Sequence, residues 1–127
     1  MVRIHVGRQK ILIIRSSIKI KMNKYQRLQL ELETSGTGKM KCFGNSMLPI
    51  LKSGSLLTFK KEEHYKEKDI VFCKVKGRWI DAHKIVKTDP TKGFLIANNH
   101  GYENGWTHTI FGKAIESEYK GQIEIIK

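Results

Sequence analysis

The chain has 127 residues, of which 39% are hydrophobic and 28% charged, and its formal net charge at pH 7 is +12. This length gives room for one domain with one modest core, and the composition is ordinary for a globular protein. The two cysteines have no metal-ligand spacing, which argues against a disulfide framework and against a zinc site.

The positive charge is concentrated at the N-terminus, because residues 1–27 hold eight Lys or Arg and no acidic residue. We interpret residues 1–21 as a basic arm or an extra edge strand, and residues 22–127 as one domain. A solvated tail is the commoner explanation of such an arm, and weak non-specific contact with nucleic acid is the alternative.

No stretch approaches the roughly 20 apolar residues that cross a bilayer, and none has the form of a secretory signal. The expected location is therefore the cytoplasm.

The first predicted element is a short helix from Asn23 to Glu33, with Asn23 as its N-cap and with Gly36 and Gly38 as its stop. After Gly38 the pattern changes to short runs of branched and aromatic residues, which are typical of strands. These strands are predicted at residues 40–43, 56–59, 70–75, 79–86, 94–97, 109–111 and 123–126. Gly, Asn and Pro clusters between them, including residues 98–105, predict turns. The fold class is mainly β, with one short N-terminal helix and a strongly bent or barrel-like sheet.

Ser46 and His83 are the candidate catalytic residues. Ser46 lies in a predicted turn between Gly44 and Pro49, and His83 lies in a later predicted strand. A serine hydroxyl becomes a good nucleophile only when a base within hydrogen-bond reach takes its proton, and imidazole suits this task. Gly44 permits a turn that presents the backbone N–H groups around Ser46 as an oxyanion hole.

Asp81 is a candidate for orienting the imidazole, since strict alternation along a strand puts it on the same face as His83, Trp79 and Ile85. The alternative interpretation is structural: a serine in such a turn commonly serves only the turn, and a histidine on a strand commonly serves packing or faces solvent.

Residues 44–54 resemble the nucleophile box of the LexA-like and signal-peptidase-like serine peptidases, in which Gly-x-Ser-Met-x-Pro-x-Leu is followed shortly by Gly-Asp. Residues 65–71, 82–86 and 111–115 resemble further segments of that superfamily in the same order. Residues 82–86 are similar to the His-Arg-Ile/Val segment of relatives in which histidine replaces lysine as the base. The resemblance implies a β-rich peptidase fold, Ser46 as nucleophile with its backbone amide in the oxyanion hole, and His83 as general base.

Three positions depart from the superfamily pattern. Ser55 replaces the aspartate of the first Gly-Asp, Lys68 replaces the glycine of the second, and Asn98 stands where His-type relatives have an aspartate that helps to hold the histidine. Asn98 is a candidate for orienting the histidine by a hydrogen bond, but it does not stabilise an imidazolium by charge. Either Glu103 or Asp81 substitutes for the missing aspartate, or catalysis is slow. Residues 98–106 also resemble a segment of small phage and bacterial signal-peptidase-like proteins, which implies a phage or mobile-element source.

The leading functional hypothesis is a serine peptidase with a Ser46/His83 dyad that hydrolyses a peptide bond in its own chain or in a phage or host protein. No cofactor is expected, and no metal, because His100 and His108 have no Cys or carboxylate at ligand spacing. The alternative is a catalytically inactive peptidase-fold module for binding or regulation, with nucleic-acid contact through the basic arm. The sequence leaves the oligomeric state open.

Overall fold

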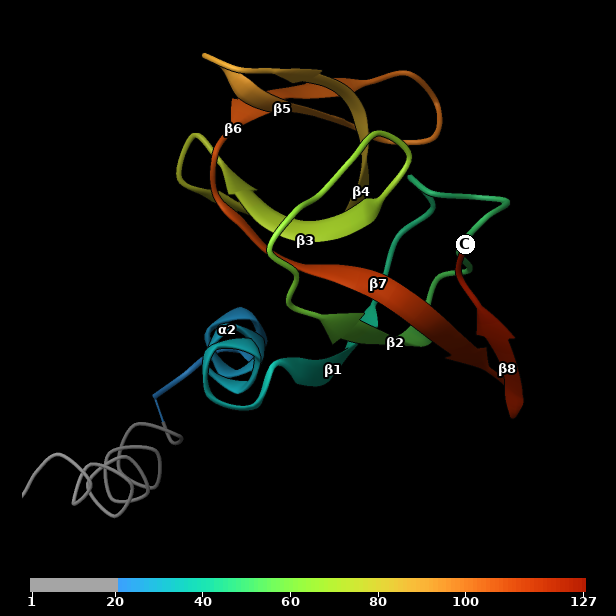
Figure 1. Ribbon diagram of the computed structural model, residues 1–127. Coiled ribbons are helices and arrows are strands. Elements are labelled where there is room, and N and C mark those ends of the chain that lie inside the picture. The colour runs from blue at the N-terminus through green and yellow to red at the C-terminus, as the bar shows by residue number, and fades with distance from the viewer. Residues whose placement is uncertain (1–20) are drawn as a thin grey trace, which may run out of the picture.

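One helix and eight strands make up residues 21–127, the part of the chain that the computed structural model describes (Figure 1). The basic arm of residues 1–21 lies almost wholly outside the described residues. The elements are α2 (Lys24–Ser35), β1 (Thr37–Cys42), β2 (Ser55–Lys60), β3 (Ile70–Val75), β4 (Arg78–Asp89), β5 (Gly93–Ala97), β6 (Glu103–Thr107), β7 (Ile110–Tyr119) and β8 (Gln122–Ile125). This order of elements confirms the mainly β class with one N-terminal helix.

All eight strands belong to one antiparallel sheet with the order β1-β2-β7-β3-β4-β5-β6, and β8 pairs with β7. Strand β7 joins the two halves of the sheet, since one part of it pairs with β2 and another with β3. The sheet curls strongly, with β3 to β6 wrapped above β1, β2, β7 and β8 (Figure 1). Thr107 at the end of β6 donates a hydrogen bond to the Lys74 carbonyl of β3, which draws the curl together.

Helix α2 has the cap at Asn23 and the stop at Gly36 that its sequence predicts, although it continues to Ser35, beyond the predicted end at Glu33. The Asn23 side chain accepts a hydrogen bond from the Gln26 backbone N–H, and the Gln26 side chain accepts one from the Asn23 backbone N–H, which makes a reciprocal cap. Gly36 ends the helix in the left-handed conformation, with φ of 84°. Leu28 and Leu32, one turn apart, are the helix residues buried against the sheet.

Strand β3 runs through the middle of the core, so its whole sequence is apolar up to Cys73. Phe72 faces the helix side, whereas Val71 and Cys73 face a second cluster inside the curl. On the helix side, the rings of Tyr25, Phe72 and Trp79 all pack against one another, and the Trp79 centroid lies 5.5 Å from that of Tyr25 and 5.6 Å from that of Phe72. This stack fixes the start of α2 against the start of β4.

One strand was not expected. Residues 98–105 are predicted as a turn, but the turn ends at Tyr102 and β6 begins at Glu103. Asn and Gly are poor strand formers, so the sequence of β6 does not show the pattern of a strand. Strands β4 and β7 are also longer than predicted, because their polar residues pair with neighbouring strands. No helix within residues 21–127 has the length and apolar character needed to cross a membrane.

Candidate active site

Ser46 lies in a loop of residues 43–54 that connects β1 to β2, here called the Ser46 loop. The Gly54 N–H donates to the Cys42 carbonyl at 2.8 Å and closes the base of the loop. Met47 and Leu51 point into the core and are only 4% and 7% exposed. The burial of these two side chains fixes the Ser46 loop against the core of the domain. The half-buried Ser46 therefore has a defined position.

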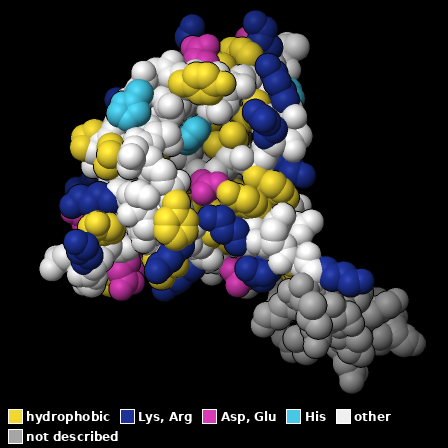
Figure 2. Space-filling model, turned by 180° about the vertical axis from the view of Figure 1, so that it is seen from behind, with side chains coloured by type: hydrophobic (Ala, Val, Ile, Leu, Met, Phe, Trp, Pro, Cys, Tyr) yellow, Lys and Arg dark blue, Asp and Glu magenta, His cyan; other side chains and the backbone are white. Residues whose placement is uncertain are grey.

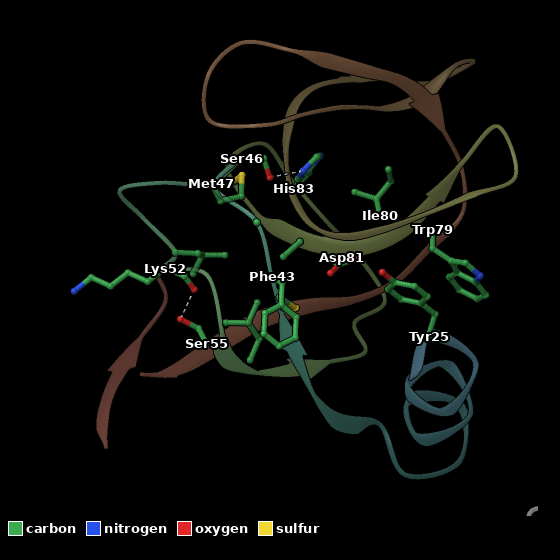
Figure 3. Close-up of a pocket in the computed structure, with 15 residues that line it drawn as sticks. Tyr25, Phe43, Ser46, Met47, Lys52, Ser55, Trp79, Ile80, Asp81 and His83 are labelled. Atoms are coloured by element: carbon green, nitrogen blue, oxygen red, sulfur yellow. Dashed lines mark hydrogen bonds between the residues drawn. The ribbon is translucent and has the colours of Figure 1, made fainter. Parts of the chain in front are cut away.

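The structure brings Ser46 and His83 together from distant parts of the sheet. The Ser46 Oγ and His83 Nε2 atoms are 3.0 Å apart, which is hydrogen-bond distance (Figure 3). His83 projects from β4, and β7 and β3 lie between β4 and β2 in the sheet order. The curl of the sheet therefore produces this contact, and both side chains are half-buried.

The other ring nitrogen of His83 is held by Asn104, which the sequence analysis did not single out. His83 Nδ1 lies 2.6 Å from Asn104 Oδ1. An amide oxygen only accepts, so Nδ1 carries the proton and the lone pair of Nε2 faces the Ser46 hydroxyl. Ala97 pairs with Glu103 and Ile96 pairs with Gly105, so Asn104 is the extra residue of a β-bulge. The bulge turns Asn104 toward His83.

None of the three sequence-based candidates for orienting His83, Asp81, Asn98 and Glu103, makes a hydrogen bond to its ring. The Asn98 side chain accepts hydrogen bonds from the backbone N–H groups of His100 and Tyr102 and so closes its own turn. Glu103 is exposed, one residue away from the position that meets the imidazole. One feature of the sequence could have indicated Asn104. It directly precedes Gly105, and a glycine within a strand often marks a β-bulge.

Asp81 is displaced from His83 by a second bulge. Val71 pairs with His83, but Cys73 pairs with Ile80, so β4 has one extra residue between these pairs and the strict alternation assumed from the sequence is broken. The Asp81 carboxylate lies 3.8 Å from the Lys24 ammonium. Burial, together with the influence of the Asp81 carboxylate, raises the pKa of Tyr25 to about 12.

Residues in the turn after β5 form hydrogen bonds with the Ser46 loop. The Asn99 backbone N–H donates to the Ser46 carbonyl at 2.9 Å, and its side-chain amide donates to the Leu48 carbonyl at 2.8 Å. His100 Nε2 lies 3.0 Å from the Asn45 carbonyl, and Lys84 donates to the Asn99 side chain at 3.0 Å. Residues 99–104 therefore touch both halves of the dyad, the serine through the turn and the histidine through Asn104.

In the described part of the chain, the backbone N–H of Ser46 is a free donor. The Gly44 N–H donates to Ser53 Oγ at 2.9 Å, so Gly44 contributes its turn, with φ of 111°, and not its amide. Within residues 21–127 the Ser46 N–H has no hydrogen-bond acceptor. An unpaired amide at the nucleophile is the donor that an oxyanion hole requires.

A comparison with protein families adds an independent observation. A family model described as Peptidase S24-like matches residues 8–115, which is most of the chain. The chain belongs to the Peptidase S24-like family. No curated protein matches the chain.

In this S24-like chain the dyad opens into a cavity of about 270 Å³ between the Ser46 loop, β4 and the start of α2 (Figure 3). Aromatic rings and one carboxylate line the part of the cavity away from the dyad. They belong to Tyr25, Phe43, Trp79 and Asp81. Within residues 21–127 no group of His, Cys, Asp and Glu side chains is arranged to hold a metal ion.

Proposed function

We propose that the chain is a serine peptidase in which Ser46 is the nucleophile and His83 is the general base. The observation that carries this proposal is the 3.0 Å contact between Ser46 Oγ and His83 Nε2, with Asn104 on the opposite ring nitrogen. Nucleophile, base and orienting group in hydrogen-bonded series are the arrangement that activates a serine. Membership of the Peptidase S24-like family supports a polypeptide substrate.

The geometry supports a two-step reaction. His83 Nε2 takes the hydroxyl proton as Ser46 Oγ attacks the substrate carbonyl carbon, and the oxyanion that forms accepts a hydrogen bond from the Ser46 N–H. The imidazolium then gives its proton to the departing amine, which leaves an ester on Ser46. Water, deprotonated by His83, attacks this ester and releases the acid, and the proton returns to the serine oxygen.

One observation favours a second candidate, a peptidase-fold module that binds polypeptide without cleaving it. Asn104 is neutral, so it orients the imidazole but does not stabilise the imidazolium by charge. Basic side chains are scattered over the face of the molecule shown in Figure 2, so this face offers nucleic acid no single basic patch. Membership of the Peptidase S24-like family supports a polypeptide as the partner of such a module.

Fluorophosphonate labelling separates the two candidates, because the probe phosphonylates only an activated serine. Trypsin releases residues 42–52, in which Ser46 is the only serine, so mass spectrometry reads the site directly. We expect labelling of this peptide in the wild type, none in Ser46→Ala, and a loss of about 100-fold or more in His83→Ala.

His108→Ala is the matched control, because His108 is an exposed histidine whose contact is with the Thr91 carbonyl and not with the dyad. We expect it to label at the wild-type rate. A wild-type sample that unfolds cooperatively and yet takes no label would contradict the peptidase and support the binding module.

A further inference from the structure

The cavity beside the dyad contains a carboxylate for which the proposed reaction has no use. Asp81 lines this cavity together with Ser46 and His83, and its side chain is 24% exposed. Among the described residues that line the cavity, Asp81 is the only one with a carboxylate. Lys52 also lines it, but its ammonium points away in Figure 3 and lies over the Tyr119 ring, 5.2 Å from the centroid.

The groups around Asp81 already hold a cation of the chain itself. The Lys24 ammonium lies 3.8 Å from the Asp81 carboxylate and donates a hydrogen bond to the Lys41 carbonyl at 3.0 Å. It is also 5.2 Å from the ring centroids of both Tyr25 and Phe43. A carboxylate, a carbonyl and two aromatic faces are the groups that bind an alkylammonium or a guanidinium.

Three of these cation-binding groups, Asp81, Tyr25 and Phe43, also line the cavity, whereas Lys24 does not. We propose that the cavity binds a lysine or arginine side chain of the polypeptide substrate and that Asp81 determines this specificity. The inference rests on the proposed peptidase function, because only a substrate bound at Ser46 would place a side chain in this cavity. The aliphatic stem of the basic residue would pass the rings of Phe43 and Trp79.

The contact with Lys24 does not prevent such binding. The Lys24 side chain is 34% exposed and its ammonium is 3.8 Å from the carboxylate, and exposed ion pairs of this kind are weak. A substrate cation adds a second partner to Asp81 or replaces Lys24. Lys24 is thus a competitor, so its removal is expected to strengthen the preference for a basic substrate residue.

A random peptide library tests the inference. The full-length chain digests the library at 150 mM salt, where the Debye length is about 8 Å and long-range repulsion by the net positive charge is screened. Mass spectrometry of the products then gives the residue preference at each position around the cleaved bond. At one position near that bond we expect Lys and Arg to be favoured over Met and Gln by about 10-fold, the size of one ion pair with cation–π contacts.

Variants of Asp81 and Lys24 test whether Asp81 causes the preference for basic residues. We expect Asp81→Asn to reduce the ratio of basic to neutral residues to about 2-fold or less and Lys24→Met to raise it, each measured within one digest so that overall rate cancels. Glu124→Gln removes the same charge from the exposed strand β8, away from this cavity, and is expected to leave the ratio unchanged.

Two negative results are distinct. Cleavage without a basic preference, or with a preference that Asp81→Asn retains, overturns the inference and leaves the peptidase intact. A wild-type chain that neither cleaves the library nor takes a fluorophosphonate label at Ser46 overturns the peptidase and the inference with it.

Discussion

The Asn104 amide oxygen lies 2.6 Å from Nδ1 of His83, so the imidazole of this S24-like chain is held by a neutral group. The contact fixes the tautomer and the direction of the ring, which the proposed general base requires before a substrate binds. In the proposed reaction, the imidazolium that forms during attack would have no compensating charge from this contact. The rate of Ser46 activation is therefore expected to depend on the identity of residue 104.

Substitution of Asn104 tests this dependence. We expect Asn104→Asp to speed fluorophosphonate labelling by about 10-fold, because a carboxylate both orients and stabilises the imidazolium. We expect Asn104→Leu to slow labelling by about 10-fold or more, because the ring loses its hydrogen-bond acceptor. The second-order labelling rate constant is the measurement. Equal rates in all three proteins would show that Asn104 does not position the base.

The Asn99 side chain is expected to keep the Ser46 loop in place. Asn99→Ala removes the hydrogen bonds to the Leu48 carbonyl and from Lys84, each worth about 0.5–1.5 kcal/mol. We expect labelling of Ser46 to slow by about 10-fold and hydrogen exchange to quicken in residues 45–51. Tyr102→Ser, at an exposed position of the same turn, is the control and should change neither. Unchanged exchange in Asn99→Ala would remove this role.

The stability of the packing of helix α2 on the sheet is expected to depend on Leu32 and much less on Leu30. Leu32 is 1% exposed and packs close to Gly112 of β7, whereas Leu30 faces partly outward. Leu32→Ala should lower the free energy of unfolding by about 2–5 kcal/mol, and Leu30→Ala by less than about 1 kcal/mol. Urea denaturation followed by tryptophan fluorescence measures both. Similar losses in the two variants would contradict the packing described.

The two thiols are expected to be unreactive in the folded chain. Burial raises the pKa of both Cys42 and Cys73 to about 12, and for Cys42 the nearby Asp81 adds to the effect. The thiolate is the form that reacts, so iodoacetamide at pH 8 should alkylate both thiols far more slowly than in urea. Rapid alkylation of Cys73 in the folded chain would contradict its burial.

The same shifts predict a loss of stability in alkali. In the unfolded chain the thiols lose their protons near their ordinary pKa of 9.0, whereas in the folded chain the pKa of both is raised to about 12. The unfolded state therefore binds fewer protons between these values, and the free energy of unfolding falls as pH rises through this window. Replacement of Cys42 by alanine should make the fall less steep. Urea unfolding from pH 8 to 10.5 measures the slope.

The sequence predicted the elements that local chemistry determines. The cap at Asn23 and the stop at Gly36 come from hydrogen bonds within a few residues, and the apolar run of β3 follows from burial on both faces. Ser46 and His83 were identifiable because a turn serine and a strand histidine in that order resemble a known peptidase pattern. Their distance of 3.0 Å depends on the curl of the whole sheet, which no local pattern encodes.

The sequence also did not predict the bulges that redirect Asn104 and Asp81. Asn104 lies in an Asn-Gly run that is typical of a turn, and only the register of β5 against β6 shows that it is an extra strand residue. Asp81 was placed beside His83 by strict alternation, which the bulge in β4 breaks. In both cases an inserted residue redirects a side chain, and insertion is a property of the pairing of two strands and not of either strand alone.

The serine and the histidine meet only because the intervening strands bend. Strands β7 and β3 separate β2 from β4, and the pairing of β7 with each flanking strand contains an irregularity, at Thr58/Phe59 and at Phe72/Cys73. The curvature of the sheet therefore sets the distance between Ser46 Oγ and His83 Nε2. Substitutions at these remote kinks, or at Gly112 where an added methyl would press on the helix, would tune the reactivity of Ser46 without touching the dyad.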